Sequence, residues 1–173
     1  MSRALKSESS LCLECGICCD GTLFSNVRLK ESDRPELLRA LGLPVRQRGQ
    51  LLRFSQPCAA LCGTHCAVYK NRPSHCREFD CLVLTRLRKG ELTREKALGL
   101  IRRARRLAKA ADRGLRRLGE TDGAAPVKLR FARMSKAMEA SQDACSGKAA
   151  RTFGEVSETM HRLHLILSEE FFR

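Results

Sequence analysis

Apolar residues recur every three or four positions through the second half of the chain, which is the spacing of one face of an α-helix. The longest such run extends over residues 93–118, with Thr93 placed to cap the helix and Gly119 to end it. The same spacing predicts two further helices, at about 127–141 and 149–171. Three helices joined by short loops predict a small antiparallel bundle.

The first half carries only short patterns, interrupted by proline and glycine. They predict a strand at 23–29, a helix at 34–41 capped by Ser32 or Asp33, a polar loop at 46–49, a strand at 51–54, and a helix from about His75 through Cys76 and Cys81 to Leu87. This half is poor in apolar residues, so metal binding is expected to supply the missing stability. The expected fold is mainly α: a small, irregular, cysteine-rich, metal-stapled module over residues 10–90, followed by a basic, bundle-like helical region over 91–173.

Nine of the ten cysteines lie in the first half, four of them between Cys12 and Cys19, and only Cys145 lies outside it. A C-x2-C-x2-C spacing suits a soft metal, because a tight loop can turn three sulfurs toward one centre. Cys18 and Cys19 are adjacent, and neighbouring side chains diverge. We therefore expect Cys19 to serve a different centre from Cys12, Cys15 and Cys18, or to bridge.

The sequence also indicates the cellular compartment in which the cysteines are found. No apolar run near the N-terminus resembles a signal peptide, and no stretch of about eighteen apolar residues could span a membrane. A cytoplasmic location is therefore expected, where thiols stay reduced and clustered cysteines indicate metal or redox chemistry. A disulfide framework is the alternative.

The spacing of the cysteines also carries a family resemblance. The string Cys12-x-x-Cys15-Gly-x-Cys18-Cys19, followed by Cys58, Cys66-x-Val-Tyr69-x-x-Arg72-Pro-x-x-Cys76-Arg-x-Phe79, resembles the YkgJ-type cysteine-cluster family of zinc- or iron-chelating domains. The resemblance implies eight metal ligands: Cys12, Cys15, Cys18, Cys19, Cys58, Cys66, Cys76 and Cys81. Cys62 is additional to the pattern, and its role is left open. The flagellin lysine methylases share the pattern, and there it is associated with an iron–sulfur cluster.

Eight thiols satisfy two four-coordinate sites, or one cluster and one zinc ion. The C-x2-C-x2-C opening and the lack of a second C-x2-C pair favour iron–sulfur over zinc. His65 and His75 neighbour the cysteines, but a lone histidine there is more often a hydrogen-bonding neighbour than a ligand. We expect a metal-centre protein, acting as an electron-transfer or accessory component or, by analogy with the methylases, in methyl transfer. Whether it is an enzyme stays open.

The competing interpretation starts from the net charge of +14. The helix over 93–118 holds ten basic residues and two acidic ones. Guanidinium groups bind phosphate in bidentate fashion, which would suit a zinc-stapled module that binds nucleic acid or an acidic partner. The arginines concerned are Arg102, Arg103, Arg105, Arg106, Arg113, Arg116 and Arg117. The alternative is a solvated face of an ordinary bundle helix, and membrane binding is not expected because the apolar face is mostly alanine.

Overall fold

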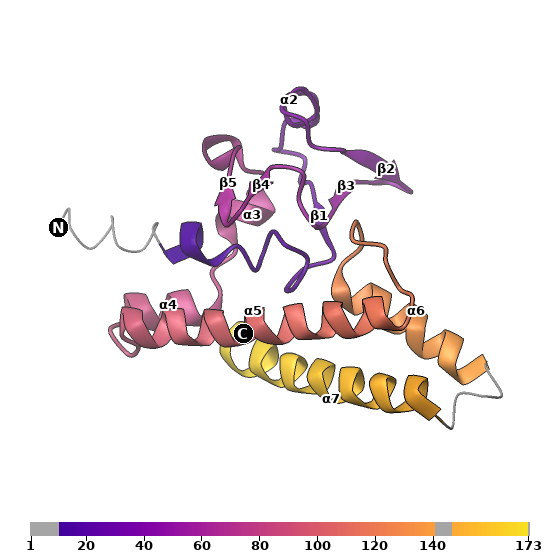
Figure 1. The fold of residues 1–173 in the computed structure, drawn as a ribbon. Coiled ribbons are helices and arrows are strands. Elements are labelled where there is room, and N and C mark those ends of the chain that lie inside the picture. The colour runs from indigo at the N-terminus through magenta and orange to yellow at the C-terminus, as the bar shows by residue number, and fades with distance from the viewer. Residues whose placement is uncertain (1–10, 141–146, 173) are drawn as a thin grey trace.

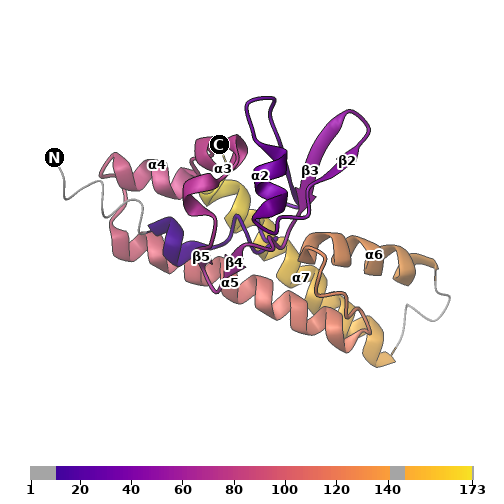
Figure 2. The ribbon, with the colours of Figure 1, turned by 90° about the horizontal axis from the view of Figure 1, so that it is seen from above.

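Two long helices form the base of the molecule in the computed structural model, which describes residues 11–140 and 147–172 (Figure 1). Helices α5 (Arg94–Arg117) and α7 (Gly147–Glu170) run side by side in opposite directions, as both views show (Figures 1 and 2). Their apolar positions keep the predicted spacing, so each buries one stripe against the other. The side chain of Thr93 caps α5 by accepting a hydrogen bond from the backbone N–H of Lys96 at 3.3 Å.

Two shorter helices complete the helical part. Helix α4 (Leu82–Arg88) precedes α5, and its first backbone N–H donates to the carbonyl of Phe171 at the end of α7. Helix α6 (Val127–Ala140) packs on α5 near its C-terminal end. There the buried Arg130 of α6 forms an ion pair with Asp112 of α5. These contacts confirm the expected helical C-terminal half.

Short strands and turns make up the rest of the N-terminal part. An antiparallel sheet of order β1-β3-β2 contains β1 (Asn26–Arg28), β2 (Arg46–Arg48) and β3 (Leu51–Ser55), with Val27 opposite Phe54. The other elements are α2 (Pro35–Ala40), the hairpin of β4 (Leu61–Cys62) and β5 (His65–Cys66), the 3₁₀ turn η1 (Tyr69–Asn71) and α3 (Ser74–Glu78). This part lies over the α5–α7 pair (Figure 1).

Within the described residues, two clusters gather most of the buried apolar side chains. The first joins the N-terminal residues Leu11, Ile17 and Leu23 to α4, α5 and α7, including Ile101 and Leu163. The second lies within the strand-containing part and consists of Val27, Leu38, Leu43, Val45, Phe54, Ala60 and Val68. The cysteine-rich segment therefore lies between two small cores. No described helix is both long and apolar enough to cross a membrane.

The mainly α fold is confirmed, and three local predictions are wrong. Residues 46–48 form strand β2 rather than a loop, although all three side chains are exposed and give no alternating pattern. Neither Ser32 nor Asp33 caps α2, because the residue preceding that helix is Arg34 and the Asp33 carboxylate bonds elsewhere. The helix expected from His75 to Leu87 is broken, since α3 ends at Glu78 and α4 begins at Leu82.

Candidate metal centre

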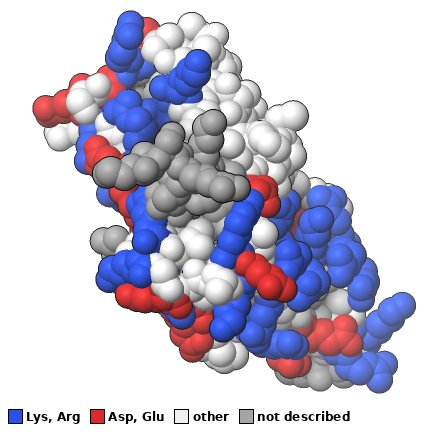
Figure 3. All heavy atoms as spheres, turned by 90° about the vertical axis from the view of Figure 1, so that its left-hand side faces the viewer, with Lys and Arg blue, Asp and Glu red and all other residues white. Residues whose placement is uncertain are grey.

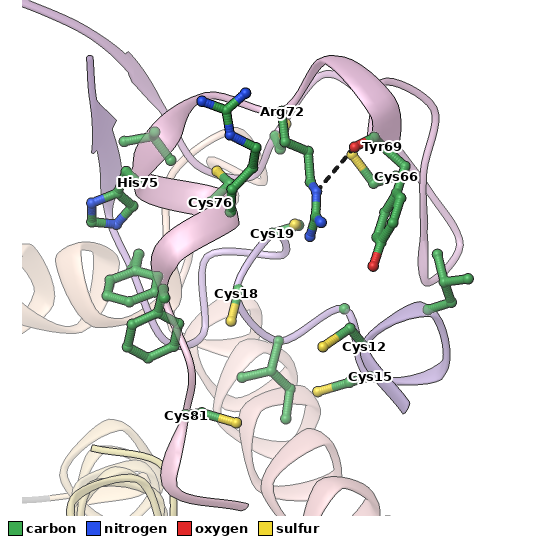
Figure 4. A pocket seen from close by; sticks show the side chains of 18 of the residues that line it. Cys12, Cys15, Cys18, Cys19, Cys66, Tyr69, Arg72, His75, Cys76 and Cys81 are labelled. Carbon is green, nitrogen blue, oxygen red and sulfur yellow. Dashed lines mark hydrogen bonds between the residues drawn. The ribbon is translucent and has the colours of Figure 1, made fainter. Parts of the chain in front are cut away.

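All eight cysteines predicted as ligands line one cavity of about 300 Å³ between the two cores. They come from six places in the fold: the helical residues 11–15, the turn that follows, the loop before β4, strand β5, helix α3 and the start of α4. Figure 4 shows Cys12, Cys15, Cys18 and Cys81 at one end of this cavity and Cys19, Cys66 and Cys76 at the other. The thiols thus fall into two groups.

The first group contains Cys12, Cys15, Cys18 and Cys81, and all four pack against the first apolar cluster. Gly16 makes the sharp turn between Cys15 and Cys18, with a φ of 68° that only glycine adopts freely. Cys81 is the residue before α4, and its sulfur accepts a hydrogen bond from the backbone N–H of Leu84 at 3.4 Å. The break between α3 and α4 therefore places this thiol at the cavity.

The second group contains Cys19, Cys58, Cys66 and Cys76, and three of these pack against the second apolar cluster. The backbone N–H of Cys58 donates to the carbonyl of Cys19 at 2.8 Å, which holds the loop before β4 against the cysteine turn. Cys66 lies in β5, and Cys76 lies in α3. Four separate segments thus converge on this end of the cavity.

The electrostatic interactions among the thiols follow the same division except between the neighbours Cys18 and Cys19, since Cys19 adds to the rise in the pKa of Cys18. Burial raises the pKa of Cys15 to about 12, and the nearby thiols that add to the rise are Cys81 and Cys12. Burial also raises the pKa of Cys19 to about 12, but there the contributing thiols are Cys58, Cys66 and Cys76. The thiols that raise the pKa of Cys19 are those of the second group, while Cys18 interacts with the first group and with Cys19 itself. That Cys19 serves a separate centre, or bridges, stays a prediction.

The raised pKa values have a chemical consequence. Burial is the largest cause at each of the thiols concerned, and it raises the pKa of Cys76 to about 12 and that of Cys18 well above its ordinary range. These thiols are protonated near pH 7 without a metal, whereas a metal binds the thiolate. Metal binding therefore releases protons, and the affinity falls as the pH is lowered.

Arg72 is the basic residue that reaches both groups. Its Nε donates to the carbonyl of Tyr69 at 3.1 Å, and its guanidinium carbon lies 3.7 Å from the centroid of the Tyr69 ring. Figure 4 shows the guanidinium pointing into the cavity. Burial raises the pKa of Cys12 and of Cys76, and the charge of Arg72 opposes that rise at both. A cation in this place offsets the negative charge of a thiolate-ligated centre.

The other candidate ligands lie elsewhere or face other partners. Cys62 and His65 are exposed on the β4–β5 hairpin and do not line the cavity. His75 lines it, but its ring packs edge-on against Phe24, with ring centroids 5.1 Å apart. His161 and His164 are exposed on α7, and Cys145 lies outside the described residues.

Two residues that hold the site in place were not predicted for that role. The Asp33 carboxylate accepts hydrogen bonds from the backbone N–H of Lys30 and from the N–H and hydroxyl of Ser74, at 2.7–2.8 Å. It thereby fixes the first turn of α3, which carries Cys76. Arg105 of α5 donates to the carbonyl of Cys15 at 3.1 Å. Both contacts span more than forty residues of sequence, so no local pattern could reveal them.

The donor chemistry fits a thiophilic metal, because every member of both groups is a thiol and the cavity is enclosed by apolar packing. Across residues 11–140 and 147–172, no three His, Cys, Asp or Glu side chains converge as tightly as ligands of a single ion. The thiols instead stand along the walls of the shared cavity.

Comparison with known proteins gives a family match over the cysteine-rich part of the chain. The sequence model of the CxxCxxCC family, described as "Putative zinc- or iron-chelating domain", matches residues 11–97, which include all eight cysteines. No curated protein and no solved structure is similar enough to the chain to match it.

Proposed function

Because the chain belongs to the CxxCxxCC family of zinc- or iron-chelating domains, we propose that it binds two metal centres, each on four cysteine thiolates. Cys12, Cys15, Cys18 and Cys81 hold the first centre, and Cys19, Cys58, Cys66 and Cys76 hold the second. The observation that carries this proposal is the division of the eight thiols into two groups of four. All four thiols of the first group pack against the first apolar cluster, and three of the second, Cys58, Cys66 and Cys76, pack against the second.

The first centre is proposed to be an iron–sulfur cluster. Its ligands combine C-x2-C-x2-C spacing with one remote cysteine, which is a common arrangement for such clusters. The cavity that all eight thiols share, about 300 Å³, leaves room for groups of several atoms, since one water molecule occupies only about 30 Å³ of liquid. The metal of the second centre is left to the metal and sulfide analysis described below.

The function proposed for this arrangement is electron transfer. An iron–sulfur cluster, when bound, accepts and releases single electrons. The chain's contribution is to enclose the thiols in apolar packing, to place Arg72 beside both groups, and to join the two centres through the Cys18–Cys19 peptide bond. Positive charge beside a cluster raises its reduction potential, which favours the reduced state.

The test is the iron, zinc and acid-labile sulfide content of protein purified without oxygen, together with its visible spectrum. Replacing Cys15 by Ser should remove the metal of the first centre, and replacing Cys76 by Ser should remove that of the second. Cys62→Ser is the matched control, because this thiol is exposed and does not line the cavity. The control should keep the full metal content.

Circular dichroism must show that each variant keeps its helices. A folded variant that loses all metal after either single replacement would contradict two separate centres. Zinc without sulfide would contradict the cluster and favour a zinc-stapled interaction module. Full-length protein that holds neither metal would overturn the proposal.

A further inference from the structure

Four basic residues of α5 form a row along one side of the helix: Arg102, Arg106, Lys109 and Arg113. Their spacing of four, three and four residues keeps them on one face, and all four are exposed. The row spans about 16 Å at a rise of about 1.5 Å per residue. Figure 3 shows Lys and Arg side chains lying side by side toward the lower right of the molecule, with a few acidic side chains among them.

Beside this row lies a groove of about 490 Å³. Arg102, Arg105, Arg106 and Lys109 line it together with Leu98 and Ile101 of the same helix. Glu14 and Thr64, from the cysteine-rich part, line it as well. Glu14, the one acidic side chain that lines the groove in the described part of the chain, forms an ion pair with Arg94.

The basic side chains of the groove are available for an external anion. Among the described residues, no carboxylate forms an ion pair with Arg102, Arg106 or Lys109. Repulsion between neighbouring cations is unfavourable in the free protein, so an anion that neutralises them gains by binding. A row of unpaired cations beside a groove is therefore suited to a polyanion.

The groove is also held in shape. Arg105 donates to the carbonyl of Cys15 at 3.1 Å, and Arg94 bonds to Glu14, so α5 is fixed to the cysteine-rich segment at two points. A site that is already formed loses little conformational entropy when a ligand binds. The basic row can therefore bind without rearrangement of the backbone.

We propose that this groove binds the phosphate backbone of nucleic acid without reading its sequence. Arginine predominates in the groove, and its planar fork matches phosphate oxygens in a bidentate manner. The row is as long as about five phosphates of one duplex strand, at about 3.4 Å each. Protein partners are anchored by aromatic or large apolar side chains, whereas this groove offers only Leu98 and the buried Ile101. No described residue that lines the groove is aromatic, which argues against stacking on bases as the main source of affinity.

The test is fluorescence anisotropy with labelled poly(U) RNA of about 20 nucleotides and with a DNA duplex of similar length, from about 50 to 200 mM salt. The groove variant is Arg102→Gln/Arg106→Gln/Lys109→Gln. The control is Arg34→Gln/Arg46→Gln/Arg48→Gln, which removes the same charge from exposed positions of the N-terminal part. We expect the groove variant to bind at least about tenfold more weakly at 100 mM salt and to lower the salt slope by about two to three. The control should stay within about twofold of the unmodified protein.

If the groove variant and the control variant lose nucleic-acid affinity equally, the groove is not the binding site, and the loss is an effect of net charge alone. If polyglutamate competes as strongly as RNA of equal charge, the ligand of the groove is an acidic protein rather than nucleic acid. No binding at 50 mM salt would also overturn the proposal. All eight cysteines and Arg105 stay in place, so metal content is measured separately on the same variants and decides the proposed function independently.

Discussion

Arg72 joins two roles in one side chain, because it stacks on Tyr69 and carries positive charge to both groups of thiols. Four thiolates around a metal leave a net negative centre, which a nearby cation such as the half-buried Arg72 stabilises. We expect Arg72→Gln to weaken metal retention about tenfold, as measured by competition with a chelator. Arg72→Lys keeps the charge but not the planar stacking on Tyr69, so its metal retention should fall much less than that of Arg72→Gln.

The Arg72 prediction is checked against Cys76→Ser, which removes a thiol directly. If Arg72→Gln retains metal as well as the unmodified protein while Cys76→Ser does not, charge compensation by Arg72 is excluded. If Arg72→Lys is as weak as Arg72→Gln, the stacking on Tyr69 rather than the charge is what matters.

At the residue level, the sequence pointed to the thiols of the cavity but not to the residues that hold their segments in place. The family resemblance implied the eight candidates, and all eight line the cavity, although their role as ligands stays a prediction. Asp33 was expected to cap the helix next to it in sequence. It bonds instead to Ser74, forty-one residues away, because the N-terminus of α3 offers it two donors.

At the scale of elements, the pairing of α5 with α7 depends on a close approach at Gly114. A Cβ built at this residue would lie 2.2 Å from Cγ2 of Val156 on α7, far inside van der Waals contact. We expect Gly114→Ala to lower the free energy of unfolding by about 1–3 kcal/mol, because the two helices must move apart. Denaturant-induced unfolding followed by circular dichroism measures the change.

Gly99 of the same helix provides the matched control, since a Cβ there meets nothing within 4 Å. Gly99→Ala should raise the free energy of unfolding by about 0.5–1 kcal/mol, through the lower entropy of the unfolded chain. Adding Val156→Ala to Gly114→Ala should recover part of the loss by restoring space. If Gly114→Ala stabilises the protein as Gly99→Ala is expected to do, the close approach of α5 and α7 at Gly114 is contradicted.

The elements that sequence predicted best are those with long periodic stripes. Helices α5 and α7 repeat their apolar spacing over six turns, and they begin and end within two residues of the expected positions. Strand β2 has no buried side chain, and it exists because it pairs with β3. Pairing between strands is a tertiary contact, so the sequence of β2 alone could not reveal it.

At the scale of the whole molecule, the two proposed metal centres differ in what supports them. The first group of thiols packs against a cluster that includes Ile101, Leu163 and Phe171 from the C-terminal half. The second packs against a cluster built only from residues between 27 and 68. The boundary at residues 90 and 91 therefore divides the core of the first centre, while it leaves the core of the second intact.

This difference predicts the behaviour of a fragment comprising residues 1–90. Without α5 and α7, Leu11, Ile17 and Leu23 lose the apolar surface that buries them, and the loop of the first group loses its hydrogen bond from Arg105. We expect the fragment to retain the metal of the second centre and to lose that of the first. Metal analysis of the purified fragment beside the full chain measures this, and Cys76→Ser in the fragment should then remove the remaining metal. A fragment that keeps both centres would show that residues 10–90 fold as an independent module, and one that keeps neither would show that the second cluster is too small to hold its thiols alone.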